Sequence, residues 1–209
     1  MNTRFPLVGV RVVLTICAVA TALVRVDAQA PTLQALANTL RQGGYTLVMR
    51  HATSPREAPT KDTANSDNPK LERQLDDAGR RGATAMGDAL RALGIPIGTV
   101  LASPTYRAME TVKFARLGSP TTVAELGDGG QSMQGVTDAQ AGSLRTRVTE
   151  VPRSGNTILV THQPNLSRAF PDWGPTVADG ETVVLQPDGK GGITLIGRIP
   201  IDEWPKLRR

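Results

Sequence analysis

The residues of this sequence best suited to chemistry are two histidines and two arginines that follow short apolar segments. The chain has only two histidines, His51 and His162, and each comes directly after a run of strand length. Arg50 precedes His51, and Arg107 lies just beyond a third run. Ligands of open α/β sheets bind outside the carboxyl ends of the strands. If the three strands are neighbours, these four side chains converge on one site; the alternative is that each histidine only ends a strand and bonds to backbone.

Such a group of side chains suits a phosphoryl group. Guanidinium groups offer planar forks of donors that match phosphate oxygens. Their positive charge disfavours the imidazolium form, which leaves a neighbouring histidine neutral and nucleophilic. Displacement on phosphorus then needs no metal, because the arginines supply the charge stabilisation that magnesium supplies in kinases. We therefore predict a site with neither a metal ion nor a cofactor.

The pattern between these residues predicts alternating strands and helices. Helical spacing and capping residues predict helices over residues 33–40, 76–93, 103–116 and 137–148. Apolar runs predict strands over residues 45–49, 99–102, 157–161, 182–185 and 193–199, of which the last two form a hairpin. We predict a three-layer α/β/α domain whose sheet is mainly parallel with an antiparallel edge.

Composition excludes several other classes of protein. A chain of 209 residues suits one domain, and 39% hydrophobic with 21% charged residues excludes wholesale disorder and several membrane spans. One cysteine excludes a disulfide framework and a cysteine-ligated zinc site. Nucleic-acid binders usually combine a basic stripe with aromatic platforms, and only 3% of these residues are aromatic. We expect no nucleic-acid partner.

The amino terminus has the pattern of an export signal. Arg4 and Arg11 precede an uncharged apolar run over residues 12–24, and small residues follow it. That run is shorter than the roughly 20 residues of a membrane-spanning helix, so we expect no stable membrane anchor. We predict a signal peptide over residues 1–30, cleaved near Ala28 or Ala30, and a mature domain over residues 31–209 in the periplasm or outside the cell.

Four segments match, in order, the motifs of one known family. They are Leu47–Ser54, Arg73–Gly79, Val100–Thr111 and Ile158–His162, which read LVMRHATS, RQLDDAG, VLASPTYRAMET and ILVTH. With them the chain resembles the histidine phosphatase superfamily, in the branch that includes the phosphoglycerate mutases. The resemblance covers most of residues 45–170 and implies the phosphoglycerate mutase-like fold.

The resemblance also implies roles for individual residues. His51 would be the nucleophile that becomes phosphohistidine, and Arg50, Arg107 and His162 would form the phosphate pocket. Ser54 falls where the family often has a pocket-lining Ser or Thr. Beyond the motif, Arg56 is either a further phosphate contact or a solvated loop charge.

A leaving alkoxide needs a proton donor that later activates water. In the family this carboxylic acid lies in the segment after the helix that carries the second arginine. Glu125 is the best match in that segment, and Asp128 is the next.

The resemblance implies a small phosphorylated substrate and a metal-independent phosphomonoester hydrolase that acts through phosphohistidine. The alternatives are a mutase, a phosphohistidine phosphatase, or a non-catalytic binder of phosphorylated ligands. Glu57 stands where mutases often have asparagine, and Gln163 follows the second histidine where phytase-like members have aspartate. Export would separate the protein from cytoplasmic mutase donors and phosphohistidine proteins, so we expect an extracytoplasmic substrate. The charge-balanced loop over residues 52–70 further favours small monophosphates over polyphosphates.

Overall fold

A six-stranded sheet organises the chain in the computed structural model, which describes Met1, residues 31–128 and residues 135–209. The strand order is β3-β2-β4-β1-β5-β6. The strands are β1 (Thr46–Arg50), β2 (Ile97–Ala102), β3 (Thr121–Thr122), β4 (Asn156–Thr161), β5 (Thr182–Pro187) and β6 (Ile193–Ile199). The first four run parallel, and β5 and β6 form an antiparallel edge beside β1. The predicted α/β fold class is confirmed.

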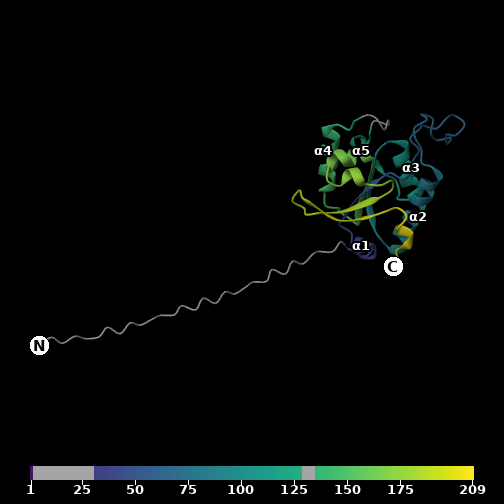
Figure 1. Cartoon of the computed structure of the whole chain (residues 1–209). Helices are drawn as coiled ribbons and strands as arrows, with labels where there is room; N and C mark the ends of the chain where they lie inside the picture. Colours follow the sequence, from purple (N-terminus) through teal and green to yellow (C-terminus); the bar gives the residue numbers. More distant parts are fainter. Residues whose placement is uncertain (2–30, 129–134) are drawn as a thin grey trace.

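Helices cover both faces of this sheet (Figure 1). They are α1 (Leu33–Leu40), α2 (Asp77–Leu93), α3 (Tyr106–Ala115), α4 (Asp138–Val148) and α5 (Gln163–Ala169), with short 3₁₀ turns η1 (Ala124–Leu126), η2 (Gly174–Thr176) and η3 (Trp204–Lys206). Helices α1, α2 and α3 share one buried cluster with Ile158 and Val160 of β4, and α4 and α5 share another with Leu159. Alternate side chains of one strand therefore serve the two layers.

Capping residues set the ends of α2 as the sequence predicts. Asp76 is the N-cap, and its Oδ1 accepts a hydrogen bond from the Gly79 amide at 2.6 Å. Gly94 ends the helix in the left-handed region, with φ of 69°. Both residues satisfy backbone groups that the helix leaves without partners.

The start of α3 differs from the prediction, which placed it at Ser103 and Pro104. The helix begins at Tyr106 with Thr105 as N-cap, but the Thr105 side chain makes no capping bond. Its hydroxyl instead lies 3.2 Å from His162 Nε2. The Thr105 side chain thus contacts a histidine and not the backbone of the helix.

The predicted signal peptide, with Ala28 and Ala30, lies outside the described residues. Within residues 31–128 and 135–209, no helix combines the length and the hydropathy that a membrane crossing requires.

Candidate active site

The sheet brings both histidines to one edge. β1 and β4 are parallel neighbours, and Arg50 pairs with Thr161 at their carboxyl ends. His51 and His162 are the next residues of each strand, and their ring centroids are 5.2 Å apart. Since parallel strands end at the same edge, the spacing of the sequence becomes proximity in space.

Arg107 lies between the two imidazoles. It sits in the first turn of α3, which follows β2, the other parallel neighbour of β4. Its side chain is fully buried, with Nε 3.2 Å from His51 Nε2 and Nη2 3.0 Å from His162 Nδ1. Nη1 has no hydrogen-bond partner among the described residues. The guanidinium therefore holds both rings and keeps one buried donor nitrogen for a further acceptor.

Hydrogen bonds determine the tautomer of His51. Its Nδ1 lies 2.7 Å from the Ala52 carbonyl oxygen, which can only accept, so Nδ1 carries the proton. Nε2 then presents its lone pair toward Arg107. Burial, followed by His162, Arg107 and Arg50, holds the pKa of His51 well below its usual value, although its bond to Ala52 opposes this shift. The ring is a neutral base with its lone pair at Nε2.

His162 has the opposite tautomer. Its Nδ1 accepts from Arg107, and its Nε2 donates to Ser103 Oγ at 2.8 Å. Burial first, and then the nearby arginines, hold the pKa of His162 well below its usual value. Two neutral imidazoles thus share one cationic guanidinium.

The structure places Asp128, and not Glu125, at this cluster. Asp128 Oδ2 lies 2.6 Å from Arg107 Nη2, and the two side chains are 3% and 0% exposed. The same oxygen is 3.6 Å from His162 Nδ1. Glu125 is exposed on η1 and does not line the pocket, because its neighbour Leu126 takes the core-facing position of that turn. Asp128, the second choice of the sequence prediction, thus lies in the cluster, and which carboxyl group donates the proton stays a prediction.

A pocket of about 590 Å³ opens at this cluster. Of the residues expected at the site, Arg50, His51, Ser54, Arg56 and His162 line it, while Arg107 is fully buried and contacts both histidines. The Ser54 hydroxyl donates to the Gln74 carbonyl at 2.8 Å, so it also fastens the loop over residues 52–76. The volume exceeds what a phosphate ion needs and leaves room for a leaving group.

Two charged residues of this pocket escaped the sequence prediction of the site. Arg73 donates from Nε to the Pro55 carbonyl at 2.6 Å and from Nη2 to the Ser54 carbonyl at 3.2 Å. Asp179 forms an ion pair with Arg50 at 2.6 Å. The family-like segment that begins at Arg73 was a signal for the first, whereas no motif contains Asp179.

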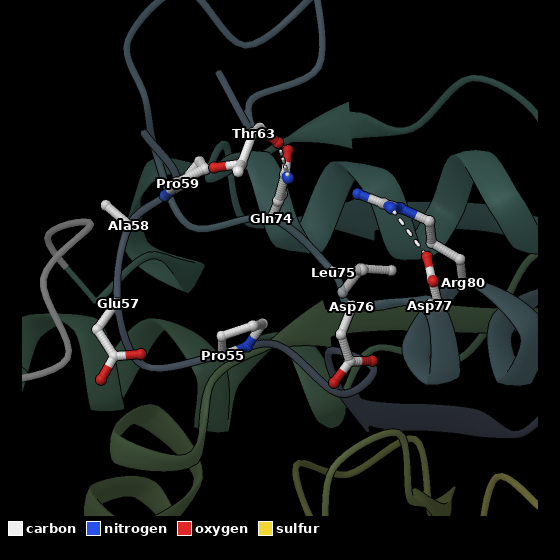
Figure 2. Close-up of a pocket in the computed structure, with 10 residues that line it drawn as sticks. All are labelled: Pro55, Glu57, Ala58, Pro59, Thr63, Gln74, Leu75, Asp76, Asp77 and Arg80. Carbon is white, nitrogen blue, oxygen red and sulfur yellow. Dashed lines mark hydrogen bonds and ion pairs between the residues drawn. The ribbon is translucent and has the colours of Figure 1, made fainter. Parts of the chain in front are cut away.

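A second cavity of about 310 Å³ lies beside the first and shares Glu57 with it (Figure 2). Its acidic residues include Asp76, which caps α2, and Asp77, which lies 3.4 Å from Arg80. The Gln74 side chain donates to the Thr63 carbonyl at 2.9 Å and closes the loop above this cavity. These polar groups stabilise the loop and the first turn of α2.

The described residues contain no group of three or more His, Cys, Asp or Glu side chains that could hold a metal ion.

Comparison with known proteins finds similar structures but no similar sequence. No family model and no curated protein matches the chain. Among solved structures, the protein histidine phosphatase SixA complexed with tungstate matches with a TM-score of 0.56 and 18% identity, over 76% of this chain and 98% of that one. The chain has the histidine phosphatase fold.

Two further structures agree with this fold. A candidate phosphohistidine phosphatase SixA from Agrobacterium tumefaciens matches with a TM-score of 0.52 and 19% identity, over 75% of this chain and 97% of that one. The product of open reading frame Rv3214 from Mycobacterium tuberculosis matches with 0.51 and 18%, over 73% and 95%. At this identity the likeness concerns the fold, and the chemistry must be argued from the side chains.

Proposed function

We propose that this chain is a metal-independent phosphomonoester hydrolase in which His51 takes the phosphoryl group. The observation that carries the proposal is the tautomer of His51. With its proton on Nδ1 and bonded to Ala52, His51 keeps its lone pair on Nε2, which accepts from Arg107 Nε in this structure. Once a bound phosphate engages Arg107, this neutral imidazole would attack phosphorus without first losing a proton.

The guanidinium groups would hold the phosphate. Arg107 offers the buried Nη1, and Arg50 lines the pocket with a buried Nε that has no hydrogen-bond partner among the described residues. Phosphate oxygens would satisfy both donors, and the positive charge would stabilise the transferring phosphoryl group. His162 donates through Nε2 to Ser103, which would keep its ring in place beside that group.

Asp128 is the carboxyl group that we propose as proton donor. The phosphorus–oxygen ester bond breaks as the bond from phosphorus to His51 Nε2 forms, and the leaving oxygen takes the proton of Asp128. In the second half-reaction, Asp128 takes a proton from water, whose oxygen attacks phosphorus and releases His51 and inorganic phosphate. A phosphate ester bound on Arg107 would take the place of the Asp128 carboxylate there, and as its monoanion it brings the proton that Asp128 passes to the leaving oxygen.

The proposed substrate is a small phosphomonoester outside the cytoplasm. The amino-terminal pattern of the sequence supports export. The pocket supports a small ester, because its lining has three arginines and three carboxylates, Glu57, Asp128 and Asp179, and buried Arg107 adds a single positive charge. A pocket of such balanced charge is poorly suited to a polyphosphate.

The proposal is tested by the hydrolysis of 4-nitrophenyl phosphate and of a panel of alkyl phosphates. We expect turnover by the wild-type protein in the presence of a metal chelator and none by the His51→Ala variant. Turnover that persists in this variant would remove His51 as the nucleophile. Retained phosphate binding with no turnover of any ester would instead support a non-catalytic binder.

A further inference from the structure

Asp179 comes to the pocket on a tight turn beside the end of β1. The turn spans residues 177–181 and leads into β5, the antiparallel neighbour of β1. The Gly180 amide donates to the His51 carbonyl at 3.0 Å, and the Arg50 amide donates to the Glu181 carbonyl at 3.3 Å. The backbone of the turn is thus bonded on both sides of the Arg50–His51 step.

Side-chain bonds keep this turn in one conformation. Glu181 accepts from the Ala178 amide at 2.8 Å and from Arg198 Nε at 2.8 Å. Arg198 also donates to the Thr176 carbonyl at 2.8 Å. The turn is therefore bonded to Arg198 of the neighbouring strand β6.

The turn holds the Arg50 guanidinium at two points. Arg50 Nη2 lies 2.6 Å from Asp179 Oδ1, and Nη1 donates to the Val177 carbonyl at 3.0 Å. The two side chains of the ion pair are 27% and 33% exposed and both line the catalytic pocket. Because Arg50 is anchored in this way, its side chain loses less conformational entropy when a phosphate binds.

The carboxylate also changes the charge that a substrate meets. Asp179 offsets the charge of Arg50, so this guanidinium attracts one phosphate less strongly than a lone guanidinium would. A second anionic group of the substrate that lies beside Arg50 would also lie near Asp179. Repulsion between like charges is larger in a partly enclosed pocket than in bulk water.

We propose that Asp179 is a specificity-determining residue that positions Arg50 and disfavours substrates with a second anionic group near the phosphate. This inference rests on the proposed phosphatase activity. The preferred substrate class is then the phosphomonoester whose leaving group is neutral or cationic next to the ester oxygen.

Two esters of nearly equal size test this preference. 2-Hydroxyethyl phosphate ends in a neutral hydroxymethyl group, and carboxymethyl phosphate ends in a carboxylate. We expect the wild-type protein to favour the neutral ester by about tenfold or more in kcat/KM, and Asp179→Asn to reduce this ratio to about threefold or less. Asparagine keeps an oxygen beside Arg50 Nη2 while it removes the charge, and the Arg50 bond to the Val177 carbonyl is left in place.

A matched control comes from a second aspartate–arginine pair. Asp138 lies 2.9 Å from Arg168 at the start of α4 and does not line the pocket. Asp138→Asn should leave both the ratio and the individual kcat/KM values unchanged. An unchanged ratio in Asp179→Asn would overturn the specificity proposal.

The binding of orthophosphate, measured by calorimetry, tests the role of Asp179 without requiring turnover. We expect a lower Kd for Asp179→Asn than for the wild type, because repulsion is removed while Arg50 stays placed. Asp179→Ala should raise the Kd, because the anchor is lost. If no ester is turned over, the proposed function fails, and the calorimetric comparison still decides the role of Asp179. Equal Kd values in all three proteins would contradict it.

Discussion

Two arginine–aspartate pairs of the same length lie at the candidate site in different surroundings. Arg107–Asp128 and Arg50–Asp179 both have nitrogen–oxygen distances of 2.6 Å. The first pair is 0% and 3% exposed, and the second is 27% and 33% exposed. Water screens Arg50–Asp179, the outer pair. Arg107–Asp128, the inner pair, depends on its own geometry and on the histidines around it. The contact distance alone therefore does not predict what either pair contributes.

The largest expected effect follows from breaking the inner pair. Arg107→Met breaks the buried ion pair with Asp128, which costs about 3–5 kcal/mol of unfolding free energy. Activity should fall by about a thousandfold or more, since an electrostatic contact to the phosphoryl group is lost. Arg50→Met should change the unfolding free energy by less than about 1 kcal/mol, because the outer pair is partly solvated. Urea melts and initial rates measure both quantities.

A double variant serves as control for that comparison. Arg107→Met combined with Asp128→Asn removes both charges and should recover much of the lost stability without restoring activity. Equal unfolding free energies for Arg107→Met and Arg50→Met would show that burial does not separate the two pairs.

A smaller effect is expected from Asp128→Asn alone, and it should depend on the leaving group. With an alkyl phosphate we expect a loss of about a hundredfold in kcat/KM, because the alkoxide needs a proton. With 4-nitrophenyl phosphate the loss should be under about tenfold, since the phenolate leaves readily. Equal losses on the two esters would indicate a structural role for Asp128.

The histidines around the inner pair predict how stability changes with pH. Burial lowers the pKa of both His51 and His162 in the folded protein, so below about pH 6.5 the unfolded chain binds more protons. Stability should therefore decrease as the pH falls below this value, by up to about 1.4 kcal/mol per pH unit for each histidine. Urea melts between pH 7 and pH 5 measure the slope.

His162→Gln should make that slope smaller, and Arg168→Gln, at an ion pair outside the pocket, should not. A stability that rises on acidification through this range would contradict the neutral, buried state of the two rings.

The smallest effect is expected at Glu125. Its carboxylate is exposed and lies outside the pocket, so Glu125→Gln should change kcat/KM by less than about twofold with either kind of ester. A large loss confined to alkyl phosphates would return the role of proton donor to Glu125.

The sequence contains enough to predict the parallel centre of the sheet and the meeting of its strand ends. β1, β2 and β4 are short apolar runs, and each ends next to a chemically distinctive residue. Their helices carry ordinary capping signals, as at Asp76 and Gly94. Strand β3 and helix α5 were not predicted, because two and seven residues are too few to show a period.

The carboxylates of the site were harder to predict for physical reasons. Asp128 and Glu125 are three positions apart, and only the packing of Leu126 decides which of them faces inward. Asp179 reaches Arg50 because β5 pairs with β1, a contact between residues far apart in the chain. Local spacing in the sequence predicts neither the inward-facing carboxylate nor the contact of Asp179 with Arg50. It does predict the positions of His51 and His162.

The central claim, that His51 accepts the phosphoryl group, is tested most directly by trapping the intermediate. The protein is mixed with 4-nitrophenyl phosphate, quenched in alkali within milliseconds, and digested for mass spectrometry. We predict a phosphate on the peptide that contains His51, stable in alkali and lost in acid, and none in the His51→Ala variant. Phosphate found on another residue, or turnover with no phosphopeptide at any quench time together with full activity of His51→Ala, would contradict the account.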